Sequence, residues 1–204
     1  MKQKFLLKHH KFTSNHIHSC DCSTHNVSIE NVMDAICRMK QGKCADDEGL
    51  VPEHFHHAPF GLIQRLVTLF NQMLKHGYVP NQFRFGFMIP IIKDNQGNHS
   101  DLSNYRGITI SPITSKVFEH VLKIVFSSHL PTSSYQFGFK KKSSTIHALH
   151  CFRETVEYFI NNESRVYCSF LDASKAFDRV IHSGLFIKLM NKNVPKVFVD
   201  IMMT

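Results

Sequence analysis

A strand–turn–strand pattern set among helical segments is the feature that most limits the fold of this chain. Aromatic residues alternate over 83–87 before a wholly apolar run, and a second short strand follows at 105–110. The polar turn at 94–101 separates the two runs, so residues 83–110 are expected to form a β-hairpin. Pro90 cannot donate to a ladder, which places the first strand at an edge or a bulge. A hairpin among helices predicts the α+β class.

Apolar residues at helical spacing predict helices around the hairpin. Ser28 is the expected N-cap of a helix over 28–40, and Ser111 is the expected cap of a helix with Pro112 at its first position. Gly77 is expected to end a strongly amphipathic helix that starts at residue 60. The inward residues of that helix are predicted to be Leu62, Ile63, Leu66, Leu69, Phe70, Met73 and Leu74. Further helices are predicted at 144–160, capped by Ser143 or Ser144, and near 183–192 and 196–204, whereas 42–55 is predicted to be a loop.

Composition points to a globular protein inside a cell. The chain has 204 residues, of which 43% are hydrophobic, and no apolar run is long enough to cross a membrane. No apolar region follows the basic start, so no secretory signal is predicted. Six cysteines at irregular spacing then indicate reduced thiols in an intracellular protein, with nothing to choose between nucleus and cytoplasm. The oligomeric state is not predicted.

The net charge of +8 fits a polyanionic partner such as nucleic acid, although a merely soluble basic domain has the same charge. Residues 1–26 read as a poorly structured lead-in rich in histidine and lysine. Within it, residues 16–22 (HIHSCDC) contain zinc-ligand types, but they crowd into one stretch instead of forming two separated pairs. A solvated tail is therefore the preferred interpretation.

A lone carboxylate, Asp172, follows an apolar run over 166–171 that is predicted to be a strand. An aspartate at the exit of a rigid strand can hold Mg²⁺, which takes oxygen ligands and often binds substrate phosphates as well. In two-metal phosphoryl transfer the ions flank the attacking and leaving oxygens, so a single aspartate requires further acids. The alternative is that Asp172 is the N-cap of a following turn.

Four sequence blocks, in order, resemble the reverse transcriptases of LINE-like, non-LTR retrotransposons of the jockey-like kind. The blocks read GKCADDEGLVPEHF, IPIIKD with SDLSNYRGITISPITSKVFEHVL, YQFGFKKKSST, and CSFLDASKAFDRV. The resemblance runs from about Gly42 to the last residue. It implies a right-hand polymerase fold that copies an RNA template onto a DNA primer from deoxynucleoside triphosphates, with two Mg²⁺ ions. No membrane partner is implied.

The resemblance assigns roles to the residues around the carboxylate. Asp172 matches the first metal-binding aspartate of the palm, and the backbone carbonyl of Ala173 would share its metal. The amides of Lys175 and Ala176 match those that hold the incoming triphosphate. Phe177 matches the ring that excludes a 2′-hydroxyl by its bulk, which is discrimination by steric clash; the alternative is a core residue.

Further roles fall on the hairpin and on the loop behind it. Lys93 and Arg106 match the fingers residues that grip the triphosphate, the lysine as a point charge and the arginine bidentately. Their alternative is a solvated strand edge. Tyr105 and Gly107 read as structural, one for packing and one for a tight backbone. Gln136, Phe139 and Lys140 are the expected template contacts, because aromatic and basic side chains together suit single-stranded nucleic acid.

The resemblance also implies what this stretch does not contain. The family has an Asp-Asp pair on a later palm hairpin, and no such pair occurs after residue 180. The pair Asp46–Asp47 precedes the fingers, and Asp178 suits a structural hydrogen bond better than a metal. The expected domains are therefore the lead-in 1–26, a fingers-like region over 27–164 and the start of a palm over 165–204, without a thumb.

An incomplete metal site predicts that this polypeptide does not polymerise DNA by itself, since such constellations act as a unit. Two functions stay open: part of an RNA-directed DNA polymerase, or a non-catalytic nucleic-acid-binding remnant or adopted module. A helical protein-interaction module would leave the four ordered blocks unexplained. An exposed palm strand also predicts low solubility or marginal stability.

Overall fold

The structure is a computed structural model and describes residues 25–173 and 176–204. They form two compact units: one contains residues 25–129 and 183–204, and the other contains residues 130–182. The lead-in before residue 25, with its HIHSCDC stretch, lies outside the described residues. The two units are defined by which residues pack together, and their boundaries do not coincide with the predicted fingers (27–164) and palm (165–204). The assignment to fingers and palm stays a prediction.

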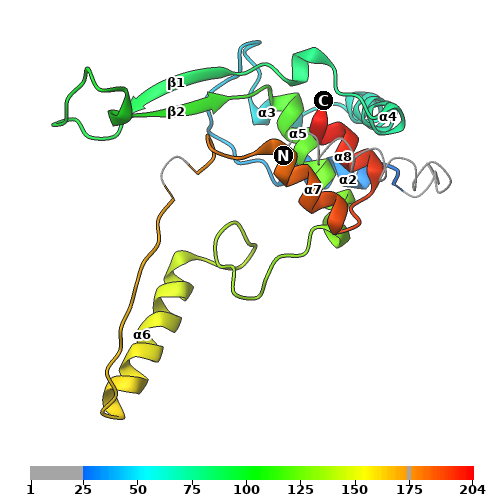
Figure 1. Cartoon of the computed structure of the whole chain (residues 1–204). Helices are drawn as coiled ribbons and strands as arrows, with labels where there is room; N and C mark the ends of the chain where they lie inside the picture. The colour runs from blue at the N-terminus through cyan, green and yellow to red at the C-terminus, as the bar shows by residue number, and fades with distance from the viewer. Residues whose placement is uncertain (1–24, 174–175) are drawn as a thin grey trace. The chain divides into compact units, whose positions relative to one another are not determined.

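The first unit is a packed group of helices. Helix α2 (Ile29–Cys37) packs against both α5 (Ile113–Val125) and α4 (Phe60–His76), and α8 (Lys196–Met203) packs against α4 (Figure 1). The last helices, α7 (His182–Asn191) and α8, therefore complete a core whose other helices come from the first 129 residues. The largest fully buried side chains are Phe70, Phe126, Ile113, Val32, Val117, Val121, Val194 and Val199.

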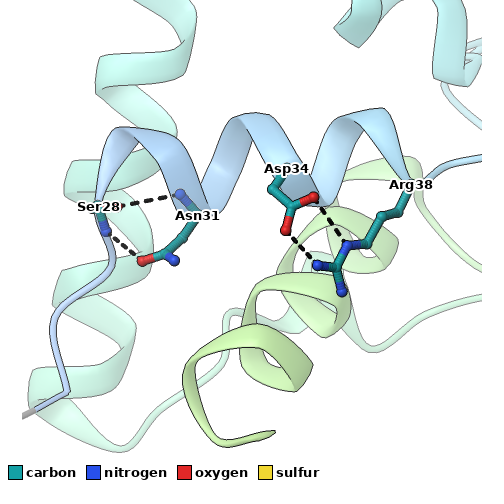
Figure 2. A network of polar contacts seen from close by, with 4 residues as sticks. All are labelled: Ser28, Asn31, Asp34 and Arg38. Carbon is teal, nitrogen blue, oxygen red and sulfur yellow. Dashed lines mark hydrogen bonds and ion pairs between the residues drawn. The ribbon is translucent and has the colours of Figure 1, made fainter. Parts of the chain in front are cut away.

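Helix α2 begins at the predicted cap. The Ser28 hydroxyl accepts a hydrogen bond from the Asn31 amide at 3.2 Å, and the Asn31 side chain accepts one from the Ser28 amide at 3.0 Å (Figure 2). This reciprocal arrangement satisfies backbone donors that the first helical turn leaves free. One turn later Asp34 pairs with Arg38, but both side chains are largely exposed and the pair contributes little to stability.

Helix α4 confirms the predicted stop and corrects the predicted face. Gly77 has φ +59° at the C-cap, a left-handed conformation that favours glycine. Leu62 and Leu69 were expected to be inward but are 38% and 37% exposed. The buried face of α4 is narrower than the sequence predicts, and these two leucines lie at its edge. The buried residues of α4 are Ile63, Leu66, Phe70, Met73 and Leu74.

A buried carboxylate, Asp46, caps α5 from a distant part of the chain. Its oxygens accept hydrogen bonds from the amides of Ile113 at 2.9 Å, Leu50 at 2.8 Å and Glu48 at 3.1 Å. The prediction that Ser111 caps this helix is wrong, because Pro112 occupies the N-cap position and has no side-chain oxygen. Asp46 supplies the missing acceptor and so ties the 46–50 loop to α5.

The loop predicted over 42–55 also contains a short helix. Helix α3 (Pro52–His56) starts with proline in its first turn, where the missing N–H costs nothing. Phe55 is buried and anchors α3 to the helical core. The stretch was read as a loop because a helix of 5 residues is too short to show an apolar period.

The β-hairpin is confirmed, with shorter strands than the pattern suggests. Strands β1 (Phe87–Ile92) and β2 (Tyr105–Ile110) pair antiparallel, with Phe87 opposite Ile110 and Ile92 opposite Tyr105 (Figure 1). The first strand does not begin at residue 83, because Asn81–Phe83 forms a 3-10 helix (η1). The ring of Phe83 instead packs edge-on against Phe118 of α5, with centroids 6.3 Å apart. Of the alternating aromatic residues, Phe83 therefore contacts helix α5, and the strand begins only at Phe87.

The second unit contains α6 (Thr145–Asn161) and the chain that follows it. The prediction of a strand over 166–171 is wrong: these residues are extended but belong to no sheet. A strand requires a neighbour, and the described part of the chain has only β1 and β2, which pair with each other. The extended residues run back along α6 (Figure 1), and Phe170 contacts Phe152 of that helix with ring centroids 5.5 Å apart.

The ends of α6 follow from its flanking residues. Ser144 occupies the predicted N-cap position, although its side chain makes no capping hydrogen bond to the helix backbone. The helix ends where Glu163 adopts φ +57° and the Ser164 amide donates to the Phe159 carbonyl at 2.9 Å. No residue of α6 is buried. Among the described residues, no helix combines the length and the apolarity needed to cross a membrane.

Replacing Asp46 by alanine is expected to lower the free energy of unfolding by roughly 3 kcal/mol, because three backbone donors lose a charged acceptor. Chemical denaturation followed by circular dichroism measures this loss. Asp47→Ala is the matched control: Asp47 is the adjacent acid, is exposed, and should cost less than about 0.5 kcal/mol. Equal losses in the two variants would contradict the capping role.

Acidification is expected to destabilise the first unit through His120. Partial burial, helped by the nearby charges of Lys123 and Arg38, lowers the pKa of His120 below its usual 6.5. The unfolded chain then binds the proton more readily, so this contribution to stability is complete above about pH 6.5 and is lost as the pH falls toward the lower folded-state pKa. Unfolding measured between pH 7 and 5 should show a smaller loss in His120→Gln than in the parent. An identical pH dependence would show that His120 does not contribute.

Candidate functional site

The hairpin places Lys93 and Arg106 on one face. Arg106 lies in β2 opposite Ile91, and Lys93 follows two residues after Ile91. Side chains alternate along a strand, so the two basic side chains lie on the same side of the hairpin. Both are exposed. They share this face with exposed apolar residues, namely Phe87, Ile89, Ile91 and Ile108.

The turn between the strands fixes the backbone around Lys93. The Asn104 side chain accepts from the Asp94 amide at 3.0 Å and donates to the Asp94 carbonyl at 2.9 Å, which closes the turn. The Lys93 amide donates to the Asn104 carbonyl at 2.8 Å, and the Lys93 Nζ donates to the Ser103 carbonyl at 2.7 Å. The lysine is therefore anchored at the end of the ladder, with its charge held over the turn.

The two neighbours of Arg106 have structural roles. The Tyr105 hydroxyl donates to the His99 carbonyl at 2.9 Å, so this ring braces the turn and does not pack into a core. A Cβ added to Gly107 would lie 2.7 Å from the Met88 sulfur, so Gly107 leaves room for that side chain, and its predicted role in a tight backbone stays a prediction. The neighbour that needs this space is a flexible side chain and not backbone.

The loop before α6 uses its polar side chains internally. The Gln136 Nε2 donates to the Gly138 carbonyl at 2.9 Å, and the Lys140 Nζ donates to the Ser133 carbonyl at 3.2 Å. Phe139 has φ +56°, a left-handed conformation unusual for a bulky residue, and its side chain is 95% exposed. Phe137 is half-buried and belongs to no buried core.

The predicted carboxylate, Asp172, ends the extended run after α6 and is exposed. Its side chain has no hydrogen bond or ion pair to any other residue that the structure describes. It does not cap a helix, because the next described helix begins at His182. The alternative interpretation of Asp172 as the N-cap of the following turn stays a prediction, because residues 174 and 175 of that turn lie outside the described residues. The carboxylate is therefore exposed and has no partner among the residues that the structure describes.

The residues after Asp172 are exposed as well. Ala173 and Ala176 are open to solvent, while Lys175 lies outside the described residues. Phe177 is 80% exposed, so the alternative of a core residue is wrong for this ring. Asp178 is also exposed and makes no structural hydrogen bond with another described residue.

The structure brings two predicted site residues into direct contact. The rings of Phe139 and Phe177 meet edge to face, with centroids 6.3 Å apart and planes at 86°. Sequence reasoning assigned them to different ligands, template and nucleotide. No residue pattern signals this contact, because it depends on the course of a loop and on an unusual φ angle.

The candidate residues fall into two groups. Lys93 and Arg106 lie in the first unit, and the carboxylate and loop residues lie in the second. Within the described residues, no group of three or more histidine, cysteine or acidic side chains is close enough to hold a metal ion. Asp172 thus supplies a suitable oxygen ligand for Mg²⁺, but it does not form a complete ligand set with the other described side chains.

The sequence is similar to known reverse transcriptases. The family described as Reverse transcriptase (RNA-dependent DNA polymerase) matches residues 92–203. The chain is 30% identical over 164 residues to the probable RNA-directed DNA polymerase from transposon X-element of Drosophila melanogaster. The aligned residues cover 78% of the chain and 18% of that protein. It is 27% identical over 176 residues to the RNA-directed DNA polymerase from mobile element jockey of Drosophila funebris, covering 84% of the chain and 19% of that protein.

A third relative gives the same coverage. The probable RNA-directed DNA polymerase from transposon BS of Drosophila melanogaster is 26% identical over 169 residues, or 80% of the chain and 18% of that protein. The chain therefore spans less than a fifth of the length of these relatives.

Proposed function

The chain belongs to the reverse transcriptase family of jockey-like, non-LTR retrotransposons, and on that premise we propose that it supplies the fingers and the first part of the palm of an RNA-directed DNA polymerase. The observation that carries the proposal is the family match over residues 92–203, since every proposed site residue lies within it. The α+β architecture supports it, as does the exposed Asp172, which has no partner among the described residues.

In this proposal Asp172 is one metal ligand and the carbonyl of Ala173 is another. Two Mg²⁺ ions in the complete site would stabilise the charge on the attacking and leaving oxygens during in-line phosphoryl transfer. The role of the chain is to hold Asp172 at the end of an extended run with its carboxylate free. The contact between Phe170 and Phe152 supports this placement by fixing the run against α6.

Each group by itself carries residues that the resemblance assigns to the incoming deoxynucleoside triphosphate. Arg106 can bind phosphate oxygens bidentately, and Lys93 adds a point charge once it releases the Ser103 carbonyl. The amides of Lys175 and Ala176 would hold the same phosphates. The exposed ring of Phe177 would lie against the sugar and exclude a 2′-hydroxyl.

The loop before α6 would lie beside the RNA template and DNA primer. An exposed ring on Phe139 can stack with a base, and Lys140 and the lysines after it carry charge that suits a phosphate backbone. Gln136 supplies a polar side chain in the same loop. Its carboxamide currently supports the loop, so a template contact would use the oxygen that this hydrogen bond leaves free.

By itself the 204-residue chain would not polymerise. Two aspartates of the 204 residues follow Asp172 and could be further metal ligands, Asp178 and Asp200. Asp200 is already paired with Lys196 in α8. The metal site then lacks the acids on which two-metal chemistry depends.

A non-catalytic nucleic-acid-binding module is the second candidate. The observation in its favour is the density of exposed aromatic and basic side chains in the second unit, together with a net charge of +8. The two functions differ in what they require of Asp172. A polymerase needs this carboxylate as a metal ligand, whereas a binding module can lose it without losing affinity for nucleic acid.

The test protein is a reverse transcriptase that contains this chain and the remaining catalytic segments. In it, Asp172→Ala is expected to reduce the rate of primer extension roughly a thousandfold or more, because the loss of one metal ligand disables the whole site. Primer extension with Mg²⁺ and an RNA template measures the rate. Asp178→Ala is the matched control, an exposed acid in the same segment, and should retain most activity. Similar rates for both variants would rule out Asp172 as a metal ligand, and extension by the 204-residue chain alone would contradict the incomplete site.

Arg106→Ala is expected to raise the KM for deoxynucleoside triphosphate roughly ten- to a hundredfold in the same protein, since a bidentate phosphate contact is lost. Arg106→Lys should recover only part of that loss, because a lysine restores the charge but not the fork of donors. Steady-state kinetics at varied nucleotide concentration measure both. Arg84→Ala, which removes another exposed arginine near the hairpin, is the control. An unchanged KM in Arg106→Ala would mean that the hairpin does not contact the nucleotide.

A further inference from the structure

Phe177 needs a partner if its ring is to select between sugars. The side chain is 80% exposed, so packing in a core does not fix its orientation. A ring that rotates freely would present a poorly defined surface to a ribose. The aromatic contact that the structure gives it is with Phe139, at 6.3 Å and 86°. These values lie within the preferred edge-to-face geometry for aromatic pairs.

Phe139 is held in an unfavourable backbone conformation to make that contact. Its φ of +56° suits glycine, and its ring is 95% exposed, so burial gives no compensation. Backbone strain of this kind persists only where the surroundings enforce it, and it is concentrated at functional positions. The residue with this backbone conformation is also the one whose ring contacts Phe177.

Hydrogen bonds within the loop enforce the conformation of Phe139 from both sides. Before it, the Gln136 amide donates to the Ser133 carbonyl at 3.1 Å and the Gln136 side chain donates to the Gly138 carbonyl at 2.9 Å. After it, the Lys140 Nζ returns to the Ser133 carbonyl at 3.2 Å. The loop is thus closed on itself, with Phe139 at its turning point.

We infer that Phe139 is a positioning residue that orients the Phe177 ring and thereby sharpens the exclusion of ribonucleotides. The inference rests on the proposed role of Phe177 at the sugar. It adds to the proposed template contact of Phe139, because a template contact alone would change affinity for nucleic acid and leave the choice between sugars unaltered.

The first test uses the 204-residue chain itself. It contains no tryptophan, so Phe177→Trp introduces a single indole whose fluorescence anisotropy decay reports the motion of that ring. Adding Phe139→Ala should increase the amplitude of the fast decay. Tyr135→Ala, which removes another exposed aromatic ring of the same loop, should not. An unchanged decay in the Phe139→Ala background would overturn the inference.

The second test compares kcat/KM for deoxy- and ribonucleotide in a reverse transcriptase that contains this chain. Phe139→Ala should reduce the preference for deoxynucleotide about three- to tenfold, the size of an edge-to-face contact. Phe177→Val should reduce it further. If Phe177→Val has no effect, the proposed role of Phe177 fails; if Phe177→Val relaxes selectivity and Phe139→Ala does not, only the positioning role fails.

Discussion

The hydrogen bonds of the Asp46 carboxylate connect the parts of the first unit on which the candidate site depends. They join the 46–50 loop to the first turn of α5 at Ile113, and β2 ends at Ile110, three residues earlier. Because so short a connection leaves little freedom, the direction of the hairpin follows from the placement of α5. The placement of Arg106 therefore depends on a buried acid that is sixty residues away in the sequence, as well as on its own pairing with Ile91.

The two units hold their residues by different means. In the first unit the helices bury a continuous core, and the aromatic pairs Phe70–Phe118 and Phe126–Phe198 lie within it, each with centroids 5.0 Å apart. In the second unit α6 buries nothing, and its neighbours are held by exposed ring contacts and loop hydrogen bonds. Such contacts open at a low free-energy cost. The segment that carries the carboxylate is therefore the part of the chain best suited to rearrange when a ligand binds.

Local chemistry was sufficient to predict most of the fold. The Ser28 cap, the Gly77 stop and the hairpin depend on a few neighbouring residues, and each was found from the sequence. The errors arise where a distant residue decides the outcome: Asp46 replaces the expected cap of α5, and Phe83 contacts a helix instead of extending β1. For the candidate site, the resemblance proposes the residues, but no sequence rule gives the backbone angle of Phe139 or its contact with Phe177.

Three of the exposed residues that break the usual packing rules are also ones that the family resemblance assigns to substrates. Phe139 and Phe177 are large apolar rings in solvent, and Asp172 is a carboxylate without a described partner. A sequence selected only for stability would bury or replace such rings, since exposed aromatic surface gains nothing in the free chain. Local rules are expected to fail at functional positions, where the compensating interaction is made with a ligand. Phe139, Phe177 and Asp172 lie in one unit and the two rings are in direct contact, which supports the proposed substrate contacts of that unit.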